Sequence, residues 1–143
     1  MPVRHGTNTP STFKVGGSQV SKLYHGSNLV WSAQAPLTVT ASPSSVGGLD
    51  SREAPAPAEV TVTSNSAVIT ATGGSGSYTY SWSRLSGSGI ITVNGTTSPN
   101  TSFSALLPQN STVMGVWRCT VSDGTSTATA DVNVTLQYEV DGA

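Results

Sequence analysis

The sequence predicts an all-β protein built around one β-sandwich, and three observations lead to this fold class. Short runs in which Val, Leu, Ile or Ala alternates with Thr or Ser recur along the chain, as at residues 37–41 and 60–63, and a period of two is typical of half-buried strands. Gly-rich stretches and the dipeptides Asn94-Gly95 and Asp123-Gly124 punctuate these runs with turn signals. No segment shows the 3.6-residue period of an amphipathic helix.

The composition of the 143-residue chain excludes several classes of function. Charged residues make up 9% of the chain and the net charge is −1, against about 25% charged residues in an average globular protein. Without a basic stripe we expect no nucleic-acid binding, and without an apolar run near 18 residues we expect no membrane span. The polar N-terminus lacks the hydrophobic region of a secretory signal peptide.

We expect three parts along the chain. Residues 1–12 are rich in Thr, Ser, Asn, Gly and Pro and predict an extended arm. Residues 13–35 hold three short apolar runs separated by Gly- and Asn-containing turns, and predict a short β attachment segment. Strands this short are not stable alone in water, so the segment needs another surface. Residues 36–140 predict the sandwich domain, since a sandwich takes roughly 100 residues.

Within the sandwich domain, the alternating runs predict the strands. They are expected at residues 37–41, 60–63, 67–71, 78–85, 90–93, 101–106, 113–121 and 126–136. The stretch from Pro43 to Pro57 is predicted to be irregular, and Asn94-Gly95 and Asp123-Gly124 are predicted tight turns. In the last strand, alternate residues from Ala128 to Leu136 are predicted to face the core.

A tryptophan and a cysteine carry a resemblance to a known fold family. Trp82 lies in mid-strand after Tyr78 and Tyr80 on the same face, and Cys119, 37 residues later, follows an aromatic residue, Trp117, by two positions. This pattern resembles strands C and F of immunoglobulin-like domains over about residues 37–138. The resemblance implies an immunoglobulin-like β-sandwich with a core that includes Ile69, Tyr80, Trp82, Trp117, Cys119, Val121, Val132 and Val134.

The sequence departs from that family at two positions. The first cysteine of the family's pair is missing, and its place falls near Ile69. The aromatic residue before the second cysteine is Trp117, where the family usually carries Tyr. With one cysteine no intrachain disulfide is possible, so we expect a sandwich without a disulfide.

A second resemblance concerns the source of the chain. Residues 77–82, 117–123 and 128–135 look like immunoglobulin-like domains of tailed-bacteriophage structural proteins, and residues 14–31 look like a short module of phage virion proteins. The resemblance implies a non-enzymatic virion protein, made in the host cytoplasm, that decorates the capsid or tail. Its partners would be other virion proteins (capsid or tail subunits) and copies of itself.

The attachment segment is predicted to bind a partner through its apolar residues. These are Phe13, Val20, Leu23, Tyr24, Leu29 and Trp31. Tyr24 and Trp31 are the expected anchors, because aromatic side chains dominate interfaces. The alternative is that these side chains fold back onto the edge of the sandwich.

No group of residues predicts catalysis or a cofactor. His5 and His25 have no acidic or cysteine partner at ligand spacing, and Cys119 is expected to be a buried small hydrophobe. The acidic residues are scattered and do not predict a calcium site: Asp50, Glu53, Asp123, Asp131 and Asp141. We therefore expect no enzyme, no metal and no cofactor.

A binding module is the alternative function. In that case the loops at one end of the sandwich, residues 73–77 and 86–89 among them, would weakly hold host cell-surface glycans. Oligomeric state separates the two functions, because a lone glycan-binding module can be a monomer.

Overall fold

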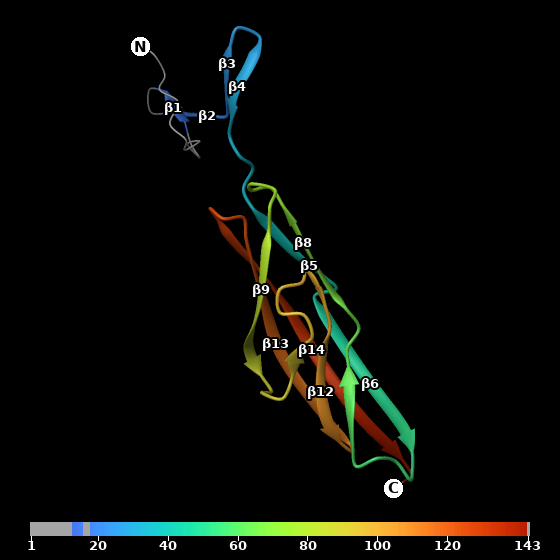
Figure 1. Cartoon of the computed structure of the whole chain (residues 1–143). Coiled ribbons are helices and arrows are strands. Elements are labelled where there is room, and N and C mark those ends of the chain that lie inside the picture. The colour runs from blue at the N-terminus through green and yellow to red at the C-terminus, as the bar shows by residue number, and fades with distance from the viewer. Residues whose placement is uncertain (1–12, 16–17, 143) are drawn as a thin grey trace. The chain divides into compact units, whose positions relative to one another are not determined.

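A computed structural model describes residues 13–15 and 18–142, and these form fourteen strands and no helix (Figure 1). The chain divides into two compact units between Pro36 and Leu37. The predicted arm, residues 1–12, lies outside the described residues.

The first unit consists of two antiparallel strand pairs. β1 (Phe13–Val15) pairs with β2 (Ser18–Val20), and β3 (Lys22–His25) pairs with β4 (Asn28–Ser32). The register of the second pair sets Tyr24 opposite Leu29. Gly26, with a φ of 65°, occupies the left-handed conformation that the turn between these strands requires.

The second unit is a sandwich, and its first layer is a four-stranded sheet in the order β6-β14-β13-β9. These strands are β6 (Ser45–Glu53), β9 (Thr79–Gly87), β13 (Ser111–Ser122) and β14 (Thr127–Asp141). β6 runs parallel to β14, while the other neighbours are antiparallel.

The second layer contains two three-stranded groups. The order β5-β8-β11 joins β5 (Thr38–Ser42), β8 (Ala67–Thr72) and β11 (Asn100–Thr101). The order β7-β12-β10 joins β7 (Glu59–Thr63), β12 (Phe103–Pro108) and β10 (Thr92–Val93).

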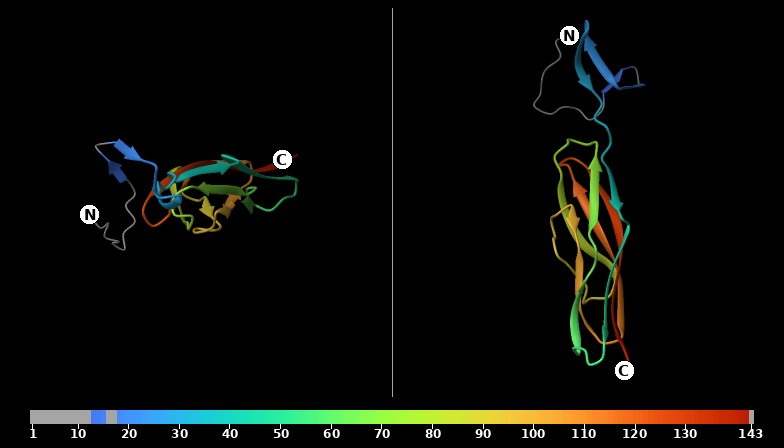
Figure 2. Two further views of the ribbon diagram at one scale, coloured as in Figure 1. Left: turned by 90° about the horizontal axis from the view of Figure 1, so that it is seen from above. Right: turned by 90° about the vertical axis from the view of Figure 1, so that its right-hand side faces the viewer.

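Hydrogen bonds between Ser64 and Phe103 connect the two groups of the second layer. Ser64 N donates to Phe103 O over 2.8 Å, and Phe103 N donates to Ser64 Oγ over 3.0 Å. The next pair is Ala67 with Thr101, so one side advances three residues while the other advances two. The two groups therefore form one continuous layer, which faces the first (Figure 2).

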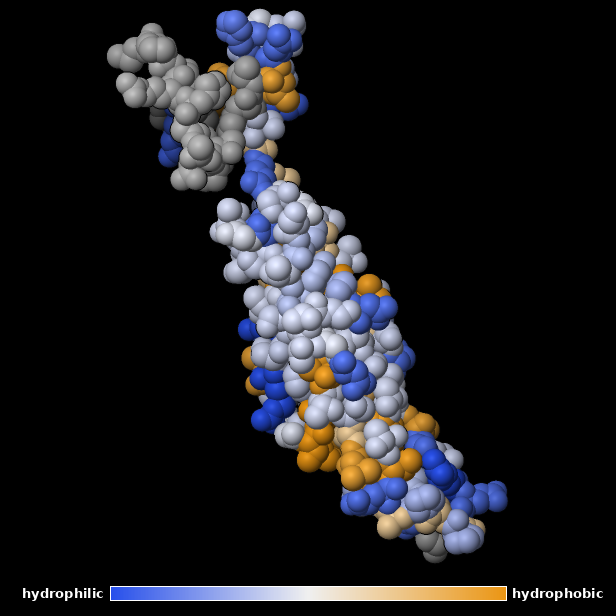
Figure 3. All heavy atoms as spheres, viewed as in Figure 1, coloured by the Kyte–Doolittle hydropathy of each residue, from blue (hydrophilic) through white to orange (hydrophobic). Residues whose placement is uncertain are grey.

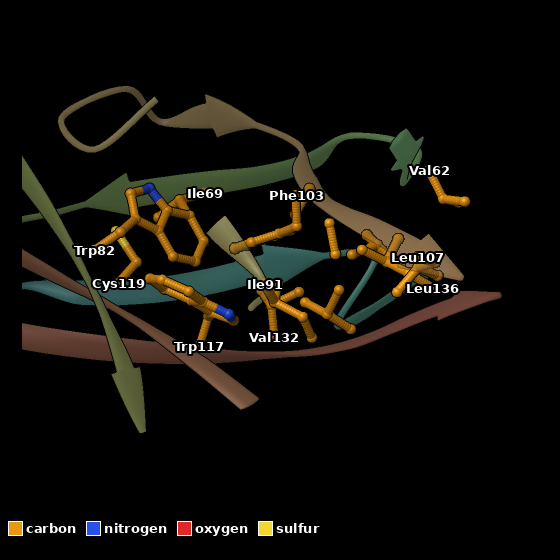
Figure 4. Packing of buried hydrophobic residues seen from close by; sticks show 14 of the residues in the cluster. Val62, Ile69, Trp82, Ile91, Phe103, Leu107, Trp117, Cys119, Val132 and Leu136 are labelled. Carbon is orange, nitrogen blue, oxygen red and sulfur yellow. The ribbon is translucent and has the colours of Figure 1, made fainter. Parts of the chain in front are cut away.

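The core lies between these layers and is built around three aromatic rings (Figure 4). The rings of Trp82 and Phe103 meet edge to face with their centroids 5.6 Å apart, and the ring centroid of Trp117 also lies 5.6 Å from that of Phe103, with the planes tilted by 43°. Trp82 Nε1 donates a hydrogen bond to Ser98 O over 3.0 Å. The immunoglobulin-like sandwich predicted from the sequence is confirmed.

The last hairpin has the turn and the buried face that the sequence predicted. β13 and β14 pair across a loop at residues 123–126, where Gly124 has a φ of 88°. In β14, Val132, Val134 and Leu136 are buried, and the same face continues through Tyr138 and Val140.

Two predictions of irregular structure and turns were wrong. The stretch from Pro43 to Pro57 contains the nine-residue strand β6, whose backbone is satisfied by a distant parallel partner. Asn94-Gly95 does not close a tight turn, because β10 ends at Val93 and the chain rejoins the sheet only at β11 and β12. Gly95 also lacks the positive φ that a two-residue hairpin turn needs.

Candidate functional site

The predicted core residues occupy the interior of the sandwich. Seven of the eight are buried, namely Ile69, Trp82, Trp117, Cys119, Val121, Val132 and Val134, and Tyr80 is half-buried. Burial also raises the pKa of the Cys119 thiol, which disfavours the reactive thiolate. These residues hold the fold and offer no accessible chemistry.

Asp123 ties two loops together at one end of the sandwich. Its carboxylate accepts hydrogen bonds from Ser126 N at 2.6 Å, from Thr125 N and Thr125 Oγ1 at 2.9 Å, and from Ser75 N at 3.0 Å. The hydrogen bonds from Ser126 and Thr125 lower the pKa of Asp123 to about 2. The sequence predicted that Asp123 lies in a turn. The hydrogen bond from Ser75 N to its carboxylate also links this turn to a loop distant in sequence.

Of the other acidic residues considered for calcium, Asp131 lies in mid-strand, whereas Asp50, Glu53 and Asp141 lie toward the paired ends of β6 and β14. Asp131 forms a two-pronged ion pair with Arg118, with distances of 2.7 and 2.8 Å, and Asp50 pairs with Arg52. In residues 13–15 and 18–142, no three His, Cys, Asp or Glu side chains are placed to hold a metal ion. The same residues include no helix long and apolar enough to cross a membrane.

The attachment segment presents apolar side chains to solvent. Val15, Tyr24 and Leu29 are 60%, 51% and 52% exposed, and Val20 and Leu23 are half-buried. The side chains of Phe13 and Trp31 lie outside what the structure describes. The cross-strand pair of Tyr24 and Leu29 is thus an available contact surface.

The two loops proposed for glycan binding lie at opposite ends of one strand, so the prediction that they share one end of the sandwich was wrong. Residues 73–77 precede β9, whereas residues 86–89 include its last two residues and the two that follow. Nine residues of strand span about 30 Å. The first loop contacts Asp123, whereas Ser88 N in the second donates to Met114 O. The two loops cannot form one binding surface.

A polar hollow of about 380 Å³ lies elsewhere, beside β11. It is lined only by uncharged residues, namely Ser66, Asn94, Gly95, Ser98, Asn100, Thr101 and Ser102. Trp82 anchors the loop that carries the lining residue Ser98, because Trp82 N donates to Thr96 O and Trp82 Nε1 donates to Ser98 O, both over 3.0 Å. The sequence missed this hollow because Asn94-Gly95 suggested a tight turn instead of a loop.

Comparison with known proteins places the sandwich in a family. The family model described as "K319L-like, PKD domain" matches residues 54–136. The solution structure of the PKD domain from human KIAA0319 is 21% identical, covering 73% of this chain and 86% of that chain with a TM-score of 0.39. The M1 domain from titin is 11% identical, covering 76% and 97% with a TM-score of 0.25. No curated protein matches the chain. Because the family model spans more than half of the sequence, the chain belongs to the K319L-like PKD domain family.

Proposed function

We propose that this chain is a non-enzymatic structural protein of a tailed-phage virion. Its N-terminal segment attaches it to a capsid or tail subunit, and its PKD-type sandwich is displayed on the particle surface as a capsid decoration or tail accessory. The observation that carries the proposal is the contrast between the two units. The sandwich buries a complete core, whereas the first unit leaves Val15, Tyr24 and Leu29 exposed.

The first unit gains stability by docking on a partner. Its strands have three to five residues each, and isolated two-stranded pairs are marginal in water. Burial of apolar surface contributes about 25 cal/mol per Å², and strand edges can add to a neighbouring sheet through backbone hydrogen bonds. The likeness of residues 14–31 to a phage virion module favours a particle subunit as that neighbour.

The sandwich does not need the first unit to fold. Among the residues whose burial the structure describes, all seventeen buried hydrophobic ones, from Val46 to Val140, lie after Pro36. We therefore expect residues 37–143 to form a soluble, folded domain that no longer attaches.

The test compares attachment and folding in the same proteins. Deleting residues 1–36 should leave the melting temperature of the sandwich nearly unchanged and abolish its co-sedimentation with the particle. In the full chain, Tyr24→Ser with Leu29→Ser should also abolish co-sedimentation. Met114→Ser, at an exposed hydrophobic residue of the sandwich, is the matched control and should attach normally. Attachment by the truncated domain would place the binding surface in the sandwich and contradict the proposal.

Weak glycan binding is the second candidate, and the polar hollow beside β11 favours it. Its volume of about 380 Å³ falls within the usual range of small-ligand sites, and its amides and hydroxyls suit a neutral polyhydroxylated ligand. Titration of ¹⁵N-labelled protein with neutral oligosaccharides should shift the amide signals of residues 94–102, and Asn100→Ala should weaken the effect. Shifts confined to other regions would exclude the hollow as the site.

A further inference from the structure

The charges of this chain are segregated between its two units. Residues 1–36 contain Arg4, Lys14 and Lys22 and no acidic residue, which gives +3. Residues 37–143 contain three arginines and seven acidic residues, which gives −4. Within the described residues the only ion pairs are Arg52–Asp50 and Arg118–Asp131, so Lys14 and Lys22 have no acidic partner there.

The negative charge of the sandwich gathers at one end. β6 and β14 run parallel and finish together, so that Asp141 lies opposite Glu53. Asp141 O also accepts a hydrogen bond from Ala54 N over 3.0 Å. Glu59 opens β7 at the same end, because Tyr138 Oη donates to Pro57 O over 2.7 Å.

We call this region the acidic end. It consists of Asp50, Glu53, Glu59, Glu139 and Asp141, together with Arg52. These six residues account for the whole net charge of the sandwich, because the other two arginines and two aspartates cancel.

Exposed hydrophobic side chains lie close to the acidic end. Leu49 directly precedes Asp50 and is 62% exposed, and Leu106, two residues before the Pro108 that pairs with Glu59, is 55% exposed. Hydrophobic surface is plainly visible on the half of the sandwich nearer the C-terminus (Figure 3). The acidic end thus combines charge with apolar surface, as the β1–β4 unit does with the opposite sign.

We propose that copies of this chain associate end to end, with the β1–β4 unit of one copy docked on the acidic end of the next. This rests on the proposed function, since it names a partner for the same attachment segment. Opposite charges steer and orient the contact, while Val15, Tyr24 and Leu29 supply apolar area. A contact between two different surfaces of identical chains is heterologous, so it continues into a ring or a filament.

The same charges disfavour other partners for the β1–β4 unit. Pairing of two such units would bring Lys14 and Lys22 against their own copies. Two described lysines are fewer than the four to eight basic residues typical of an anionic-membrane site. They are also too few for the multiple phosphate contacts on which nucleic-acid affinity depends.

The experiment is sedimentation velocity of the full chain over a range of concentrations, in about 0.05 M and about 0.5 M NaCl, because salt screens charges beyond about 10 Å at 0.1 M. The average mass should rise with concentration and fall at high salt. Lys14→Glu with Lys22→Glu should weaken association at least about tenfold, and Glu53→Lys with Asp141→Lys should do the same. Ser83→Lys with Thr129→Lys adds positive charge at exposed sites away from the acidic end and should leave association intact.

Mixing the two weakened variants is the decisive step. Each then offers the surface that complements the other, so association should return only in the mixture. A full chain that stays monomeric at high concentration, or variants that do not recover on mixing, would overturn the inference. If such a monomer still co-sediments with the particle through residues 1–36, the proposed function stands with a particle subunit as the partner. A full chain that neither self-associates nor co-sediments with the particle would refute both the end-to-end association and the proposed function.

Discussion

Gly48 marks the closest approach of β6 to the opposite layer, and its replacement tests that packing. A Cβ at this position would lie 2.4 Å from Thr63 O, 2.8 Å from Thr63 C and 3.1 Å from Ser64 N. Carbon–oxygen contacts ordinarily lie at about 3.3 Å or beyond, so Gly48→Ala requires a displacement of about 1 Å. The obstructing atoms belong to the backbone of Thr63 and Ser64, at the end of β7, and cannot rotate away.

β6 cannot retreat freely, because it is bonded on both sides. It pairs with β14 along its whole length, and Gly47 exchanges two hydrogen bonds with Asn65 at 2.8 and 3.0 Å. Overpacking of this kind costs about 1–3 kcal/mol. For a domain of this size the melting temperature should fall by roughly 4–24 °C, since each kcal/mol shifts it by about 4–8 °C.

Urea denaturation followed by tryptophan fluorescence measures the loss, and Gly47→Ala is the matched control. Gly47 is exposed, and the nearest atom to its added Cβ would be Thr135 O at 3.3 Å, so this variant should lose much less stability. A Gly48→Ala protein as stable as the parent would refute the close-approach argument. Equal losses in the two variants would show that any side chain on this strand is harmful.

Four further predictions concern the core and one loop. Trp82→Ala should lower the free energy of unfolding by about 3–5 kcal/mol. Trp82→Phe should lower the free energy of unfolding by about 1 kcal/mol more than Trp117→Phe does. The reason is that Trp82 Nε1 donates to Ser98 O, while Trp117 Nε1 has no partner among the described residues. Equal losses of unfolding free energy in urea denaturation would contradict this. Cys119 should react with a thiol reagent only as fast as the domain opens, since it is fully buried; rapid labelling of the native protein would disprove it. Asp123 has a pKa of about 2 against an ordinary 3.8, so its ionised form stabilises the fold above about pH 4 and that contribution is lost as the pH falls through 2. Acid denaturation should therefore show Asp123→Asn to be less stable than the parent above about pH 4, with a difference that shrinks toward pH 2.

The sequence predicted those parts of the fold that depend on local alternation. Residues 128–136 alternate between apolar and polar side chains, and Val132, Val134 and Leu136 are buried on the face expected. Trp117, Cys119 and Val121 are likewise buried on one face of β13. β6 was not predicted, because its inward positions carry Val46, Gly48 and Asp50, and these residues do not form the alternating hydrophobic pattern of a half-buried strand.

The candidate surfaces were only partly foreseeable for a related reason. The exposed side chains of Tyr24 and Leu29 follow from the short strands that carry them. The acidic end depends on a parallel register between Glu53 and Asp141, residues far apart in sequence. Neither turn residues nor hydrophobic periodicity predict a pairing between two residues so far apart in sequence.

The position of β14 has a consequence for how the domain is made. This strand lies between β13 and β6 and hydrogen-bonds to both, so the first layer has no interior strand until β14 is in place. A ribosome would release nearly the whole sandwich sequence while β6 still lacks its partner. The nascent domain therefore has to remain soluble with an open sheet edge, and completes its fold only after residue 141 has been synthesised. Pairing between segments so distant in sequence is also slow. The low hydrophobicity and the many Ser and Thr residues of β6 and its flanks suit a chain that must wait in this state without aggregating.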